Sequence, residues 1–260
     1  MIELILQQLG PIIMASSKIR LVLDDSPTKR YGKKIEGAGY HHNPTPGRTN
    51  AKTCFGHSWV VAVLVVTHPL FGEISFPVAA ELYLRQKEID KLKDKYKREF
   101  QTKTTMAVNI VKRLTPKFAG FDKPIEVIVD GGYAKDTVLL PLKELCMCTF
   151  GIEEVFKDLK EIWGWGKQEL RLLESNEAAT VMNMLLFGMV ELATWHRTSE
   201  ELIDRKDCPW DDASRRPSHA DRRNFLRRSM LLNEFNAALA SQSIANKLKS
   251  ALKRLLNLAV

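Results

Sequence analysis

The residues best suited to chemistry are aspartates that follow two apolar runs of the sequence. Asp24 and Asp25 come directly after the run Ser17–Leu23, and Asp130 comes after Pro124–Val129. Because ligands collect at the carboxyl ends of neighbouring strands, these acids would meet at one edge of a sheet. Carboxylates in close contact repel each other unless a cation lies between them, and Mg²⁺ is the hard cation that suits oxygen ligands. For one aspartate alone a turn former or helix cap is the simpler explanation; the two sites together favour a metal.

A third carboxylate would complete a site for two metal ions, and Glu153 is the candidate. It lies in a predicted helix, Ile152–Trp163, whose apolar residues recur at helical spacing. Lys160 follows seven residues later, on nearly the same side and about 10.5 Å along the axis. A helix that presents a glutamate to a metal and a lysine to a phosphate suits phosphodiester chemistry. Taken alone, Glu153 and Lys157 would be an ordinary surface pair four residues apart.

Other residues that could bind a ligand have plainer explanations. His41 and His42 lack further ligands at metal spacing, and Cys146 and Cys148 lack a second cysteine pair. Polar surface and core packing are therefore favoured over a metal site at these positions. Trp165, which lies between two glycines, is left open between stacking on a nucleobase and packing in the core.

The elements that must position the acids show both strand and helix periodicity. Hairpin strands followed by a strand–helix unit predict an α/β fold, in which a mixed sheet is flanked by helices. The predicted strands are 17–23, 55–67, 73–84 and 124–129, and the predicted helices are 1–9, 86–114, 134–145, 152–163, 174–196, 225–239 and 243–258.

Composition excludes several classes of protein and suggests a partner. The 260 residues are 45% hydrophobic and 27% charged, which excludes a disordered, collagen-like or coiled-coil chain. The formal net charge is +8, and residues 205–260 hold 12 basic and 5 acidic side chains. This asymmetry predicts a polyanion such as nucleic acid, although a solvated helical surface explains it equally well. The longest apolar run, Trp59–Val66, is too short to span a membrane, and the four cysteines form no CxxC pair, which suits a reducing cytosol.

Three stretches together resemble the bacterial insertion-sequence DDE transposases. The third stretch is similar to the C-terminal signature of that family, in which a lysine follows a glutamate at the spacing of Glu153 and Lys160. The stretches are LVLDDSPTKRYGKKIEGAGYHHNPTPG at 21–47, VIVDGGYAK at 127–135 and IEEVFKDLKEIWGWGKQELR at 152–171.

The resemblance implies an RNase H-like catalytic domain that cleaves and joins DNA strands with two divalent ions, Mg²⁺ or Mn²⁺. By motif position, Asp24 or Asp25 would join Asp130 and Glu153 in the catalytic triad, with Asp24, Asp130 and Glu153 as metal ligands. Lys160 would contact the DNA backbone near the cut. The partners implied are transposon-end and target DNA, with a homodimer as a candidate assembly, in the bacterial cytoplasm at the nucleoid and without a membrane. Further predicted DNA contacts are Lys29, Arg30, Arg215, Arg216, Arg222 and Arg223.

The chain departs from the family pattern in two intervals. Only 22 residues separate Asp130 from Glu153, where relatives usually have a strand and a large β-rich insertion. About 20 residues precede the first aspartate strand, where relatives have a helical region. We therefore expect a shortened and internally deleted copy, with residues 1–17 as a remnant of the helical region, 18–203 as the RNase H-like domain and 204–260 as a basic helical region. The predicted function is DNA transposition by metal-dependent cleavage and strand transfer, and the alternative is a non-catalytic DNA-binding fragment.

Overall fold

The computed structural model describes most of the chain. The described residues are 2–32, 34–43, 51–130, 132–133, 135–143, 147–150, 159–205, 211–212 and 214–240, with the backbone alone described for 147–150 and 235–240. Glu153 and the predicted helix 243–258 therefore lie outside the described residues. The strands are β1 (Ile19–Lys29), β2 (Gly39–His42), β3 (Thr53–His68), β4 (Gly72–Tyr83), β5 (Ile125–Val129) and β6 (Met147–Phe150). The helices are α1 (Ile2–Ala15), α2 (Gln86–Leu92), α3 (Lys103–Phe118), the 3₁₀ turn η2 (Ala119–Phe121), α4 (Asp136–Leu142), α6 (Leu173–Ala193), α7 (Ser199–Leu202) and α8 (His219–Ala240).

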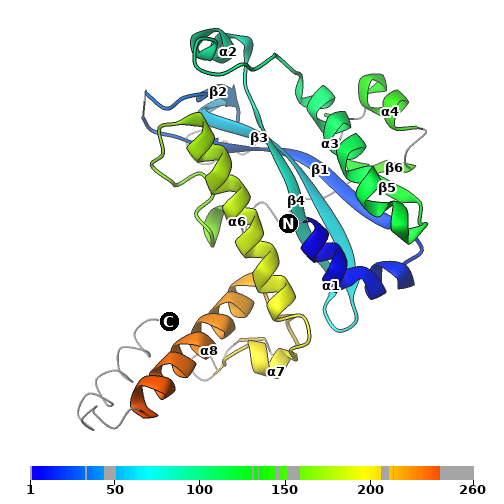
Figure 1. Cartoon of the computed structure of the whole chain (residues 1–260), viewed down its shortest axis with the longest axis vertical. Helices are drawn as coiled ribbons and strands as arrows, with labels where there is room; N and C mark the ends of the chain where they lie inside the picture. The colour runs from blue at the N-terminus through cyan, green and yellow to red at the C-terminus, as the bar shows by residue number, and fades with distance from the viewer. Residues whose placement is uncertain are drawn as a thin grey trace. The chain divides into compact units, whose positions relative to one another are not determined.

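The strands form one mixed sheet, in the order β2-β3-β1-β5-β6, with β4 also paired to β3. β1 is antiparallel to β3 and parallel to β5, which is in turn parallel to β6. Figure 1 shows α3 and α4 on one face of the sheet and α6 on the other. The predicted α/β architecture, with antiparallel hairpin strands, parallel strands and flanking helices, is confirmed.

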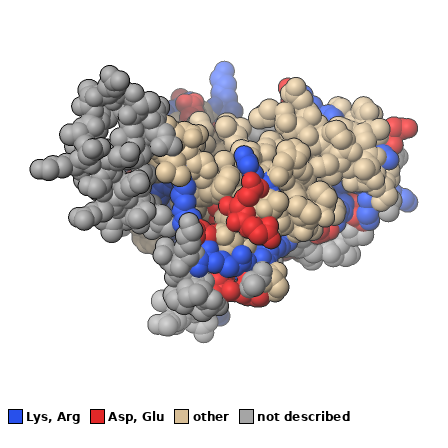
Figure 2. Space-filling view, turned by 90° about the horizontal axis from the view of Figure 1, so that it is seen from below, with Lys and Arg blue, Asp and Glu red and all other residues tan. Residues whose placement is uncertain are grey.

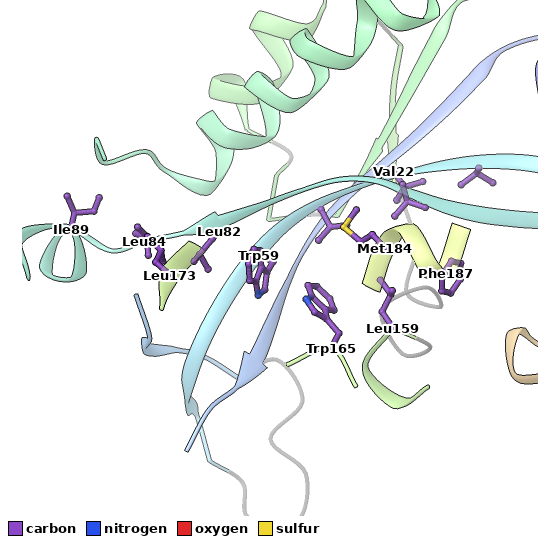
Figure 3. Close-up of a cluster of buried hydrophobic side chains, with 13 residues drawn as sticks. Val22, Trp59, Leu82, Leu84, Ile89, Leu159, Trp165, Leu173, Met184 and Phe187 are labelled. Carbon is purple, nitrogen blue, oxygen red and sulfur yellow. The ribbon is translucent and has the colours of Figure 1, made fainter. Parts of the chain in front are cut away.

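The central strand β3 explains why the sheet holds together. Its residues from Gly56 to Val66 are almost all buried, because helices cover both faces of the sheet at this strand. On the α6 side, Val22, Trp59 and Val61 pack with Trp165 and Met184 in one apolar cluster, seen in Figure 3. Trp165 is 3% exposed, so this tryptophan packs in the core and is not available to stack on a nucleobase.

Two predicted helices differ from the observed ones. The N-terminal helix runs through Pro11 to Ala15 instead of ending before the proline, because Ile5, Leu9 and Ile13 bury one continuous apolar stripe. The single helix predicted over 86–114 is instead α2 and α3 with a non-helical segment between them. In that segment the Tyr96 hydroxyl donates to Glu36 Oε2 at 2.9 Å, which holds the chain against the loop after β1.

By its internal contacts the chain divides into two units, Met1–Gly188 and Met189–Val260. The second unit has a buried ionic core, in which Glu191 lies 2.6 Å from His219 Nδ1 and 3.3 Å from Arg222 Nε. All three side chains are at most 4% exposed, so this group joins the end of α6 to α8. Among the described helices, no segment has both the length and the apolar character of a membrane span.

Candidate functional site

Asp24 and Asp130 are neighbours across the parallel pair β1–β5. The paired register ends at Leu23 and Val129, and each aspartate is the next residue along the chain. Paired residues of adjacent strands lie about 4.8 Å apart and direct their side chains to the same face. The charge of Asp130 is among those that raise the pKa of Asp24, so the two carboxyl groups are close enough to interact electrostatically. β1 does not end at the aspartates, as the sequence suggested, but continues to Lys29 along β3.

Asp24 is a half-buried acid in a strongly negative environment. Its Oδ1 accepts the backbone N–H of Asp25 at 2.6 Å. The pKa of Asp24 is raised to about 7, chiefly by burial and also by the charges of Asp25 and Asp130, while the hydrogen bond from Asp25 and the charge of Lys103 act in the opposite direction. Asp24 is therefore the carboxyl group at this site that a bound cation would stabilise most.

Asp25 has a different environment, because adjacent strand residues face opposite sides of a sheet. Its Oδ2 forms an ion pair with Lys103, the first residue of α3. Its Oδ1 accepts the Tyr133 hydroxyl at 3.2 Å, and Ser58 Oγ lies 3.4 Å from Oδ2. The structure thus separates the doubled acid into one residue that faces α3 and is neutralised there, and one that shares its side with Asp130.

The turn after β5 orients Asp130 and closes over Asp25. Asp130 Oδ1 accepts the N–H groups of Gly132 at 2.8 Å and Tyr133 at 3.3 Å. Tyr133 is buried, and burial together with the charge of Asp25 raises its pKa, so the hydroxyl remains a hydrogen-bond donor. Sequence reasoning missed both Tyr133 and Lys103. The position of Tyr133 three residues after Asp130 was a usable signal, whereas nothing in the sequence links Lys103 to Asp25.

Lys160 lies close enough to the acids to feel their charge. It follows the fully buried Leu159 in a short helical turn and is itself half-buried. Burial lowers the pKa of Lys160, the charges of Cys54 and Asp24 oppose that shift, and the charge of Lys29 adds to it. The structure therefore brings Lys160 near Asp24 and Lys29, while Glu153 lies outside the described residues.

The donor atoms of this region fit a hard divalent cation. Asp24 and Asp130 supply only carboxylate oxygens, which are the ligands that Mg²⁺ prefers. The pKa of Asp24 is raised chiefly by burial and also by the neighbouring charges of Asp25 and Asp130, and a bound cation would favour its ionised form. Within the described residues no three acids, histidines or cysteines come together as a metal site. A third protein ligand would have to come from another part of the chain, and Glu153 was the predicted one.

Arg30 does not have the position expected of a DNA contact. It is 6% exposed, and its guanidinium donates to Gly166 O at 2.7 Å, Gln168 O at 2.6 Å and Asn176 Oδ1 at 2.6 Å. Burial lowers the pKa of Arg30. The prediction that Arg30 binds DNA is therefore corrected, since its donors hold the segment after Lys160 against the end of β1. Lys29, the preceding residue, is exposed as expected.

The C-terminal arginines are also more engaged within the protein than their number suggested. Arg215 is ion-paired with Asp211 and Asp221, each at 2.7 Å, and the buried Arg222 is paired with Glu191. Figure 2 shows acidic and basic side chains adjoining one another on the face that it draws. Arg222 is therefore corrected from a DNA contact to a core residue. Arg216 is exposed and Arg223 is half-buried, and both keep their predicted role as a proposal.

The histidine pair behaves as polar structure. His41 is 8% exposed and stacks edge-on against Tyr83 at 6.0 Å between ring centroids, while His42 is exposed. Burial lowers the pKa of His41 to about 4, so it is neutral at pH 7.

Comparisons with known proteins give a family match and similarity to solved structures. A family model described as "DDE superfamily endonuclease" matches residues 2–150. No curated protein matches the chain. Among solved structures the chain is similar to the Mos1 transposase in its paired-end complex with the left transposon end, at 13% identity and a TM-score of 0.32. That similarity covers 75% of this chain, which spans 58% of the length of the transposase.

Proposed function

The chain belongs to the DDE superfamily of endonucleases, and from that premise we propose that it acts in DNA transposition by cutting and joining DNA strands at transposon ends. The observation that carries the proposal is that Asp24 and Asp130 each follow the last residue of the parallel pairing between β1 and β5 and interact electrostatically. The half-buried Lys160, which senses the charge of Asp24, adds a cation beside them. Acids for a metal and a lysine for a phosphate are the groups that phosphodiester chemistry requires.

The proposed roles of the acids follow from their surroundings. Asp24 and Asp130 would hold divalent metal, with Glu153 as the third ligand. The bound metal would supply activation of the attacking oxygen and stabilisation of the leaving 3′ oxygen. Asp25 is already paired with Lys103 and hydrogen-bonded to Tyr133, so we assign it to positioning β1 against α3.

The proposed role of Lys160 is to bind the DNA backbone. Its ammonium lies where the charges of Asp24 and Lys29 both reach it, and the segment that follows it is fixed by Arg30. A phosphate group next to the scissile bond would pair with Lys160, and the neighbouring phosphate would reach the exposed Lys29. Both contacts are electrostatic, so they add affinity that decreases with salt concentration.

A nicking assay tests this function directly. The full chain is incubated with Mg²⁺ and a supercoiled plasmid that carries the DNA flanking its gene. We expect nicking by the wild type and by the exposed control Asp90→Asn, and loss of nicking in Asp24→Asn and Asp130→Asn. Asp25→Asn should retain measurable nicking, because Asp25 is paired with Lys103.

The outcomes separate transposition from the alternative function. Binding of DNA that weakens with salt, without nicking by the wild type, would favour a non-catalytic DNA-binding fragment and contradict the proposal. Equal nicking by wild type and Asp130→Asn would show that the cut is made elsewhere. Loss of nicking in Asp25→Asn with retention in Asp24→Asn would reverse the assignment of the two adjacent acids.

A further inference from the structure

The loop after β1 displays an aromatic side chain to solvent beside the candidate site. Tyr31 is 94% exposed, the largest exposure among the large apolar and aromatic side chains that the structure describes. Neither neighbour in the sequence covers the ring, because Arg30 is buried and Gly32 has no side chain. A tyrosine ring this exposed contributes almost nothing to the core.

The position of Tyr31 is fixed by the residue before it. The Arg30 backbone N–H donates to Phe55 O at 2.9 Å, and its guanidinium donates to three oxygens of the segment after Lys160. Because Arg30 faces inward from an extended chain, the next side chain must face outward. Tyr31 is therefore presented by an anchored backbone, so an ordered ring can bind a partner at a low entropic cost.

The charges around Tyr31 favour a nucleic acid. Lys29 and Lys34 are exposed near it in the sequence, and the closest acid along the loop, Glu36, is already paired with Lys95 at 2.6 Å. Lys29 also lies close enough to Lys160 to lower its pKa. Lys160 and Lys29 thus supply cations between Asp24 and the tyrosine, which suits a bound DNA backbone.

We propose that Tyr31 stacks on an unpaired nucleobase of the bound DNA strand, a few nucleotides from the cut. This inference rests on the proposed function. Tyr31 lies seven positions after Asp24 along an extended chain, a span of at most about 23 Å. At about 3.4 Å per nucleotide, the stacked base lies within about seven nucleotides of the scissile phosphate. The ring supplies the contact, and the hydroxyl is not needed.

The test measures binding of the full chain, without metal, to a single-stranded oligonucleotide that carries 2-aminopurine, whose fluorescence falls when it stacks. We expect Tyr31→Ala to bind about 5- to 150-fold more weakly and to lose the fluorescence decrease, and Tyr31→Phe to behave as the wild type. Leu70→Ala, at the exposed turn between β3 and β4, is the matched control and should change neither value. A melting curve of each variant verifies folding.

Salt dependence distinguishes stacking from charge. Tyr31→Ala should keep the wild-type slope of log affinity against log salt, because no phosphate contact is lost, whereas Lys29→Gln should reduce it. Wild-type binding by Tyr31→Ala, or equal losses in Tyr31→Ala and Tyr31→Phe, would overturn the stacking inference while leaving the proposed function intact. A wild type that does not bind DNA would overturn both.

Discussion

Arg30 offers a sharp test of how the segment after Lys160 is held. A buried guanidinium has three donor groups engaged by oxygens at 2.6–2.7 Å, and its Nε lies 3.4 Å from His57 Nδ1. We consider two replacements, Arg30→Lys, which keeps the charge, and Arg30→Met, which removes it. If the forked geometry of the guanidinium is what matters, then lysine will be no better than methionine.

The magnitude follows from the bonds that each variant loses. A hydrogen bond from a charged donor contributes about 1.5–3 kcal/mol, so the loss of two bonds in Arg30→Lys costs about 3–6 kcal/mol. Lysine also keeps a buried charge with fewer partners, which retains a desolvation cost of several kcal/mol. Methionine loses all of the bonds but also that desolvation cost, so we expect Arg30→Met to be destabilised by about 3 kcal/mol.

Urea denaturation followed by tryptophan fluorescence measures the free energy of unfolding. Arg113→Met is the matched control, because Arg113 is 58% exposed and pairs with Glu81 at 2.6 Å on the surface. Such a surface pair contributes about 0–1 kcal/mol. If Arg30→Lys unfolds within about 0.5 kcal/mol of the wild type, the range of an ordinary surface substitution, then the fork does not hold this segment and the reasoning fails.

Two further predictions concern glycine and histidine. Gly166 has φ +88°, and an added Cβ would lie 2.5 Å from the Thr28 side chain, whereas Gly72 has φ +74° and open space around it. In urea denaturation we expect the free energy of unfolding to fall by about 1 kcal/mol in Gly72→Ala and by about 3 kcal/mol in Gly166→Ala. Both variants strain the backbone, but only Gly166→Ala adds a steric clash. Equal losses in the two variants would contradict this reasoning. Burial lowers the pKa of His57 from 6.5 to about 4, so the folded state resists protonation and stability falls as the pH decreases from 6.5 towards 4. The free energy of unfolding of His57→Gln, measured against pH, should fall less steeply over that range than that of the wild type. The exposed His42→Gln is the control and should follow the wild type. An unchanged slope in His57→Gln would refute the view that buried His57 causes the loss of stability.

The sequence predicted the order of the elements better than their ends. Asp24 and Asp25 suggested the end of a strand, because two adjacent charges are unfavourable in a sheet pattern. β1 nevertheless continues to Lys29, since β3 provides a paired backbone as far as Gly56. That pairing is a property of the partner strand, so the local pattern around the aspartates could not show it.

The number of charged residues could be counted correctly from the sequence, but the sequence could not show which groups each charge contacts. Arg30 and Arg222 appear in the sequence as two more members of basic segments. In the structure one binds carbonyl and amide oxygens and the other a buried glutamate. Burial of an arginine depends on acceptors that lie far along the chain, such as Asn176 for Arg30 and Glu191 for Arg222, so composition overstates the basic surface that is available to DNA.

The adjacent acids show how one strand can give two like residues different roles. Alternation along β1 places Asp25 towards α3, where Lys103 neutralises it, and leaves Asp24 on the side of Asp130. The short interval between Asp130 and Glu153 is not the only part of the chain that sets the position of Lys160 relative to Asp24. That position is also set by Arg30, which joins the end of β1 to the segment that follows Lys160. A chain with a short interval at this point can therefore still bring its lysine to the acids, provided that Arg30 remains in place.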